Sequence, residues 1–307
     1  MLNIIDHNSE PWSSKYRSKN RQNGAYTYSI DIVKFYIPII QRLLKNSSRD
    51  ALVSTCGQIL PCHHPEDYDV RIQWIHDIKM IYNYVDALKD SSSEERKRWL
   101  FVVSSQSYAE LLSKVNLYSV IIPLAIDAEE VRKYKVPADK NNRDIIYFGN
   151  VYREKTEQYY KIWETLTRLG WNLTTISMRD ISPLEGHANP PKTLKIKGAE
   201  AWKEISRYKY GIGVGRCLAE MYALGLKCLV SGNSFGGIVM SSNDAKEQLL
   251  RNYRSDAYTF TDSIETALEN LDKSLTPQLD IGARSKDVEM IFKNQFKHMG
   301  LLETSSL

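Results

Sequence analysis

The chain has 307 residues, of which 42% are apolar and 25% are charged, and its formal net charge is +4. This length and composition are sufficient for two domains with cores of their own and argue against general disorder. The mild positive charge permits binding to nucleic acid without requiring it. No apolar run approaches the ~20 residues of a membrane helix, and the first residues lack a signal-peptide pattern. We therefore expect a cytoplasmic protein without stable membrane insertion.

Apolar runs alternate with segments of helical periodicity along the chain, which is typical of parallel sheets of the α/β class. In the first half, we expect helices over 29–45 and 106–115 and strands over 51–60, 70–76, 99–105 and 119–126. In the second half, we expect strands over 143–150 and 171–177, helices over 157–170 and 199–208, and then a strand, a glycine turn, a helix and a strand over 208–232. A last helix over 285–300 has apolar residues at helical spacing that could pack on the first domain.

The polar segment 134–144 contains a proline and shows no periodicity, which predicts a domain boundary near residue 138. The predicted domains therefore cover residues 1–138 and 139–307. Two doubly wound domains that face each other form a cleft at the carboxyl ends of their strands, where ligands of such folds usually bind.

Metal sites and disulfides are not favoured by the sequence. The cysteines are far apart, and two of them lie in apolar runs, which indicates reduced core thiols; they are Cys56, Cys62, Cys217 and Cys228. Two histidines follow Cys62, but no second ligand pair has zinc-finger spacing. Asp67 and Asp69 form an Asp-x-Asp pair, but the pair precedes an apolar strand, so a solvated loop is the better interpretation.

A glycine turn precedes the expected helix near residue 216. Gly213 and Gly215 would let backbone N–H groups and the positive helix end point into the cleft, which favours an anion such as phosphate. Arg216 could pair with phosphate oxygens, and Glu220 could bind ribose hydroxyls. A helix start that only needs close packing, with Glu220 in solvent, explains the same pattern equally well. The spacing does not match the dinucleotide fingerprint, and the chain contains no Gly-Lys-Ser/Thr phosphate loop.

The segment 213–232, GVGRCLAEMYALGLKCLVSG, resembles the donor-nucleotide segment of GT-B glycosyltransferases of the glycogen-synthase-like superfamily. In that family a Gly-x-Gly turn opens a helix that carries a glutamate. Gly213, Gly215 and Glu220 match this pattern, whereas Ile212 occupies the position of the family's first glutamate. Because that first carboxylate contacts the transferred sugar in the family, Ile212 bears on the identity of the sugar and on the stereochemical course.

Other segments resemble the same family in order and spacing. In IIYFGNVYREK, Gly149 and Lys155 match residues that bind the donor diphosphate, while Asn150 replaces an arginine whose charge Arg153 could supply. Near the N-terminus, Gly24 matches a glycine loop that faces the diphosphate from the first domain. The resemblance covers nearly the whole chain. It implies an α/β protein with two Rossmann-like domains facing each other across a cleft (GT-B), a UDP-sugar as donor, and no cofactor or divalent metal.

The strand near residue 70 ends in His76 and Asp77 and resembles a strand end of phage α-glucosyltransferases that modify hydroxymethylcytosine in DNA. Asp77 would act as a general base in an inverting enzyme or would position the acceptor in a retaining one. The alternative is that these two residues only cap the following helix.

The resemblance favours double-stranded DNA with hydroxymethylated bases as the acceptor. Basic residues at 15–21 and at 190–198 could contact its phosphates, although a solvated charged face is the commoner explanation. Two alternatives remain open: a transferase that builds a bacterial surface glycan or glycolipid, and a nucleotide-binding module without turnover.

Overall fold

The computed structural model describes residues 2–5, 36–45, 49–55, 59, 64–75, 78–122, 126–151, 155–188, 190–191, 193–245, 263–277 and 281–302. The chain forms two compact units, Met1–Ala125 together with Ile281–Leu307, and Ile126–Asp280. The predicted boundary near residue 138 lies later than this division, because α7 (Ala128–Arg132) packs against α10 (Gly215–Ala223) in the second unit. Within the described residues, no helix combines the length and the apolar character needed to cross a bilayer.

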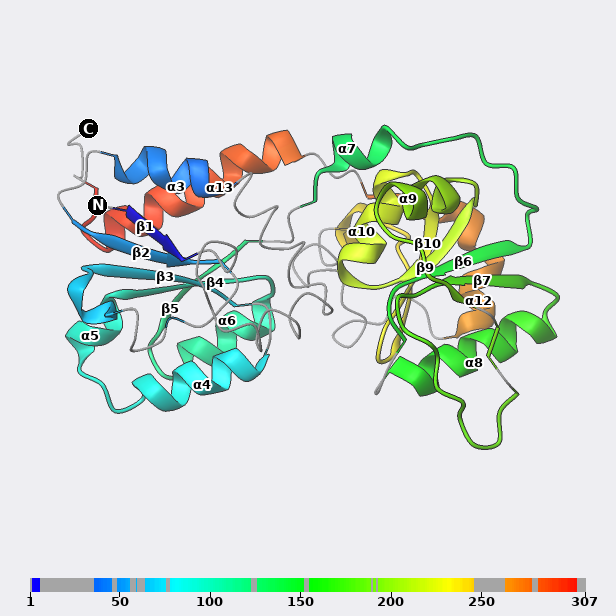
Figure 1. Cartoon of the computed structure of the whole chain (residues 1–307), viewed down its shortest axis with the longest axis horizontal. Coiled ribbons are helices and arrows are strands. Elements are labelled where there is room, and N and C mark those ends of the chain that lie inside the picture. Colours follow the sequence, from blue (N-terminus) through cyan, green and yellow to red (C-terminus); the bar gives the residue numbers. More distant parts are fainter. Residues whose placement is uncertain are drawn as a thin grey trace. The chain divides into compact units, whose positions relative to one another are not determined.

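The first unit contains a five-stranded sheet in the order β1-β2-β3-β4-β5, and all neighbouring strands in it are parallel (Figure 1). The strands are β1 (Leu2–Ile5), β2 (Ala51–Ser54), β3 (Val70–Ile75), β4 (Trp99–Val103) and β5 (Tyr118–Ile121). Every residue of β2, β3 and β4 is buried, as expected for a parallel sheet that is covered on both faces. The predicted strands near residues 51, 70, 99 and 119 are thus confirmed, with shorter bounds.

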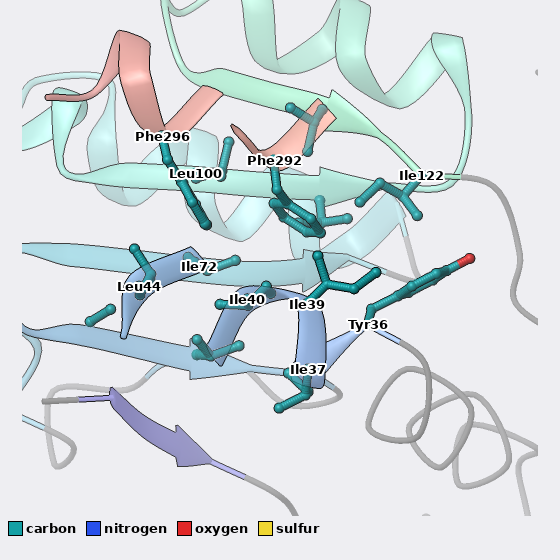
Figure 2. Packing of buried hydrophobic residues seen from close by; sticks show 14 of the residues in the cluster. Tyr36, Ile37, Ile39, Ile40, Leu44, Ile72, Leu100, Ile122, Phe292 and Phe296 are labelled. Carbon is teal, nitrogen blue, oxygen red and sulfur yellow. The ribbon is translucent and has the colours of Figure 1, made fainter. Parts of the chain in front are cut away.

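One face of this sheet is covered by α3 (Ile37–Leu44) and by α13 (Ile281–His298), which returns from the end of the chain. Figure 2 shows Phe292 and Phe296 of α13 in the same apolar cluster as residues of α3, β3 and β4. Both phenylalanine side chains are fully buried, and each contributes about 2 kcal/mol of apolar burial. The C-terminal helix therefore belongs to the core of the first unit. The other face is covered by α4 (Ile78–Leu88) and α6 (Gln106–Ser113).

A buried polar network fixes the backbone near residue 59 against β3. The Oε1 atom of Gln73 accepts hydrogen bonds from the backbone N–H of Ile59 at 3.0 Å and from the hydroxyl of Tyr84 at 2.6 Å. The Nε2 atom of Gln73 donates to the carbonyl of Trp74 at 2.7 Å. Burial raises the pKa of Tyr84, so its hydroxyl remains a donor throughout the physiological range.

The second unit contains a six-stranded sheet in the order β11-β10-β9-β6-β7-β8 (Figure 1). The strands are β6 (Asp144–Phe148), β7 (Asn172–Ile176), β8 (Thr193–Leu194), β9 (Tyr210–Gly213), β10 (Lys227–Ser231) and β11 (Phe235–Ile238). Only β11 is antiparallel to its neighbour. Counted from β6, the spatial order is 3-2-1-4-5-6, which is the order of a doubly wound Rossmann sheet.

Helices cover both faces of this second sheet. The apolar cluster on one face joins residues of α8 (Lys155–Arg168) and α12 (Ile264–Glu269) to Ile212 of β9. On the other face, α9 (Ala199–Ser206) and α10 contact each other, and Met221 of α10 lies against Gly211 and Gly213 of β9. Because successive residues of a strand point to opposite faces, this alternation along β9 shows that the sheet lies between two helical layers. The predicted α/β class is confirmed, and both units are consistent with Rossmann-like domains.

Candidate functional site

The candidate site lies where the strand order of the second sheet reverses, between β6 and β9. The two strands are parallel neighbours and end together, with Phe148 opposite Gly213. Ligands of doubly wound sheets bind outside the carboxyl ends of the strands at such a switch point. Gly149 and Asn150 follow β6 directly, and Gly215 is the first residue of α10. Local sequence patterns from two distant segments therefore meet at one place.

The two glycines of the turn are needed for different reasons. A Cβ atom on Gly213 would lie 2.7 Å from the Cε atom of Met221 and 3.1 Å from the carbonyl oxygen of Phe148. Gly215 has a φ of +60°, but a Cβ atom there would meet nothing within 4 Å. Close packing of β9 thus explains Gly213, whereas Gly215 supplies a left-handed conformation and leaves open space at the start of α10.

Gly213→Ala is expected to lower the free energy of unfolding by about 1–3 kcal/mol, because the added methyl group overpacks the contact between β9, β6 and α10. Urea unfolding followed by circular dichroism measures the change. Gly215→Asn is the matched control, since asparagine tolerates positive φ and would find open space. An equal loss in the two variants would contradict this explanation of Gly213.

Asn150 joins the ends of β6 and β7. Its Oδ1 atom accepts hydrogen bonds from the backbone N–H of Met178 at 3.0 Å and from the hydroxyl of Ser177 at 3.4 Å. The neighbouring Gly149 donates its backbone N–H to the carbonyl of Ile176 at 3.0 Å. The Asn150 side chain therefore ties the residues after β6 to the residues after β7.

Two cations from different helices act on the thiol of Cys217. Lys155 is in the first turn of α8, and Arg216 is in the first turn of α10. The pKa of Cys217 is raised to about 12 by burial and by the negative charge of Glu220, whereas the charges of Lys155 and Arg216 oppose this rise. All three charged groups thus lie within electrostatic range of one thiol. A Cβ atom on Gly149 would lie 3.8 Å from the sulfur of Cys217, so this thiol is next to the end of β6.

Cys217 is expected to react with iodoacetamide at pH 8 on the order of 10³-fold more slowly in the folded protein than in urea, because its thiolate is scarce. Mass analysis of the peptide that contains Cys217 measures the two rates. Because the pKa of Cys217 is higher in the folded than in the unfolded state, its contribution to the free energy of unfolding is complete below about pH 8.5. This contribution is lost as the pH rises from there through the folded pKa. Cys217 is only partly buried, and equal rates in both states would contradict the raised pKa of its thiol.

Glu220 is buried rather than solvated, with only 5% of the residue exposed. Its Oε1 atom accepts from Nε of Arg216 at 2.7 Å, and its Oε2 atom accepts from the indole N–H of Trp202 at 2.9 Å. Trp202 is on α9 and was not among the residues predicted to belong to the site. Helical periodicity places Trp202 on a helix, but a single sequence gives no signal for its contact with a carboxylate in the next helix.

A cavity of about 600 Å³ lies at the carboxyl ends of β7 and β8. It is lined by Asp180, Ile181, Pro190, Pro191, Thr193, Leu194, Lys195 and Ile196. Most of these side chains are apolar, and a salt bridge of 2.8 Å joins Lys195 to Asp180. The loop after β7, whose sequence is too irregular for a structural prediction, thus contributes to a hollow at the β7–β8 edge of the same sheet.

Several predicted functional residues lie outside the described part of the chain. They are Gly24, His76, Asp77, Arg153 and the basic stretch 15–21. Asp69, the second member of the Asp-x-Asp pair, accepts a hydrogen bond from the backbone N–H of Asp50 at 3.0 Å and so joins the residues that precede β3 and β2. Among the described residues, no group of three or more His, Cys, Asp or Glu side chains is arranged to hold a metal ion.

Comparison of the chain with models of known protein families, and with curated proteins, finds no match. The function must therefore be inferred from the residues at the switch point and from their geometry.

Proposed function

We propose that the protein is a glycosyltransferase of the GT-B type, which transfers a sugar from a nucleoside diphosphate sugar to a hydroxyl group. UDP is the proposed carrier. The observation that carries this proposal is that Lys155, at the start of α8, and Arg216, after Gly215 at the start of α10, both lie within electrostatic range of Cys217, which is next to the end of β6. Two cations beside the starts of two helices suit a diphosphate better than a neutral ligand.

The same groups suit the chemistry of sugar transfer. When the bond between the sugar and the diphosphate breaks, negative charge grows on the leaving diphosphate. Lys155, Arg216 and the positive end of α10 would stabilise that charge without a divalent cation. Ile212 has no carboxylate, and it is fully buried in the core that faces α8. This position therefore makes no polar contact with the transferred sugar. In the proposal, the cavity beside β8 provides further room for the donor.

The proposed acceptor is a hydroxymethylated pyrimidine in double-stranded DNA. Asp77 is proposed to accept the proton of the acceptor hydroxyl or to position that hydroxyl. Support for DNA comes from the sequence resemblance at His76 and Asp77, and the net charge of +4 is compatible with it. A surface glycan or glycolipid acceptor is the alternative for the same donor site.

The test is the release of UDP from a panel of UDP-sugars, with and without DNA that contains 5-hydroxymethylcytosine or 5-hydroxymethyluracil. Mass analysis of the nucleosides then detects the product. A sugar-sized mass gain on one base supports both donor and acceptor. Hydrolysis of a donor without a DNA product supports the transferase and redirects the search to glycans. Asp77→Asn should abolish turnover and retain UDP binding, whereas UDP binding by the wild type without any turnover would leave a nucleotide-binding module.

A further inference from the structure

The carboxylate of Glu220 is already engaged on both oxygens. One donor is Arg216, four residues earlier on the same helix, and the other is Trp202 on the neighbouring helix. Each carboxylate oxygen can accept more than one hydrogen bond, so a ribose ligand needs oxygens that are accessible to the ligand. With 5% of the residue exposed, Glu220 is instead built into the contact between α9 and α10.

Arg216 is the more accessible member of the ion pair. Its side chain is 17% exposed, against 6% for that of Glu220. It follows Gly215, beside which a Cβ atom would find open space, and it lies in the first turn of α10. The bond to Glu220 uses Nε, one part of a planar group with five N–H donors whose fork geometry suits phosphate oxygens.

Trp202 fixes the direction of the carboxylate. Its ring packs against the ring of Tyr134, with centroids 5.4 Å apart and planes tilted by 41°. This contact limits the rotation of the indole, so its N–H holds Oε2 of Glu220 in place and leaves Oε1 directed at Arg216. The chain of contacts thus runs from Tyr134 through Trp202 and Glu220 to the guanidinium.

We infer that Glu220 is a positioning residue rather than a ribose ligand, and that Glu220 and Trp202 together orient Arg216 to bind the diphosphate of the nucleotide. This inference rests on the proposed function, because it names which group of that site touches which part of the donor. Arg216 and Trp202 donate to different oxygens of Glu220, and a neutral amide replaces one of these oxygens with an NH2 group, which would face a donor instead of accepting from it.

The test compares Glu220→Gln and Trp202→Phe with the wild type by calorimetric titration. The probes are UDP, UDP without its two ribose hydroxyls (2′,3′-dideoxy-UDP), uridine and inorganic pyrophosphate. Glu220→Gln should weaken UDP and pyrophosphate by about tenfold, since one charge-assisted bond is lost, and Trp202→Phe by about threefold. Both variants should leave the affinity for uridine and the ratio of UDP to dideoxy-UDP affinity unchanged. Glu200→Gln, on the exposed first turn of α9, is the matched control and should behave as the wild type.

A ratio of UDP to dideoxy-UDP affinity that collapses in Glu220→Gln, with pyrophosphate binding intact, would overturn the inference and return Glu220 to the ribose. Thermal melting of each variant shows that lost affinity is not lost folding. The wild type could bind pyrophosphate but not UDP, with pyrophosphate binding weakened in Glu220→Gln. This result would uphold the orientation of Arg216 and overturn the nucleotide-sugar proposal. Binding of neither probe would overturn both.

Discussion

Arg71→Ala is expected to lower the free energy of unfolding by about 3 kcal/mol, because it removes one partner of an ion pair that is buried on the arginine side. The side chain of Arg71 is 2% exposed and that of Glu95, in α5 (Ser93–Lys97), is 35% exposed. Arg71 donates to Glu95 and, through Nε, to the carbonyl of Pro65 at 2.5 Å. Its guanidinium also lies over the ring of Trp99, 5.3 Å from the centroid. Alanine would leave the carbonyl without this donor and Glu95 without its cation.

Burial lowers the pKa of Arg71, and Glu95 opposes this shift. The charge is therefore held at a desolvation cost, and an apolar side chain of similar length should recover part of the loss. We expect Arg71→Met to be less destabilising than Arg71→Ala, because methionine fills the space and its burial is favourable.

Urea unfolding of the two variants tests this order. Lys97→Ala is the control, since Lys97 pairs with Glu94 on the exposed side of the same short helix and should leave the midpoint within experimental error. If Arg71→Ala moved the midpoint no further than Lys97→Ala, the buried pair would have no role in stability. If Arg71→Met were the more damaging variant, the loss would come from the charge rather than from the packing.

Most strands of both sheets could be predicted because a parallel strand that is covered on both faces has a continuous apolar sequence, but β1 of the first sheet was not predicted. Two strands of the second sheet lack this signal. β8 has only two residues, and β11 contains Gly236 and Gly237, which hide its strand propensity. The sequence does not signal the division before Ile126, because α7 is short and acidic at its start and its packing partner α10 lies far along the chain.

The candidate site could be predicted only where its signals are local. The turn at Gly213 and Gly215 and the helix that follows are continuous in sequence, so they were expected at one strand end. The environment of Glu220 was not predictable, since it depends on Trp202 in the preceding helix. Likewise, Asn150 could be assigned to the end of β6 but not to its hydrogen bond with the backbone of Met178. Such side-chain contacts between different helices and strands depend on tertiary packing, and no short sequence pattern predicts them.

Lys155→Ala is expected to slow sugar transfer by about 10²-fold and to weaken UDP binding much less. Lys155 is in the first turn of α8, and its charge acts on the thiol of Cys217. Charge on the diphosphate increases as the bond to the sugar breaks. A cation at this point therefore stabilises the transition state more than the bound donor, and its loss lowers kcat more than it raises Kd.

Steady-state UDP release, together with calorimetric titration of UDP, separates the two effects of Lys155→Ala. Lys161→Ala is the matched control, because Lys161 is on the same helix, is exposed, and pairs with Glu157 at 2.6 Å. A variant at Lys155 that transfers sugar at the wild-type rate would remove this residue from the diphosphate site. A loss of UDP affinity as large as the loss of turnover would instead mean that Lys155 binds the ground state and the transition state equally. The negative charge of the leaving group would then be neutralised by the positive end of α10 and by Arg216, which donates a hydrogen bond to the buried carboxylate of Glu220.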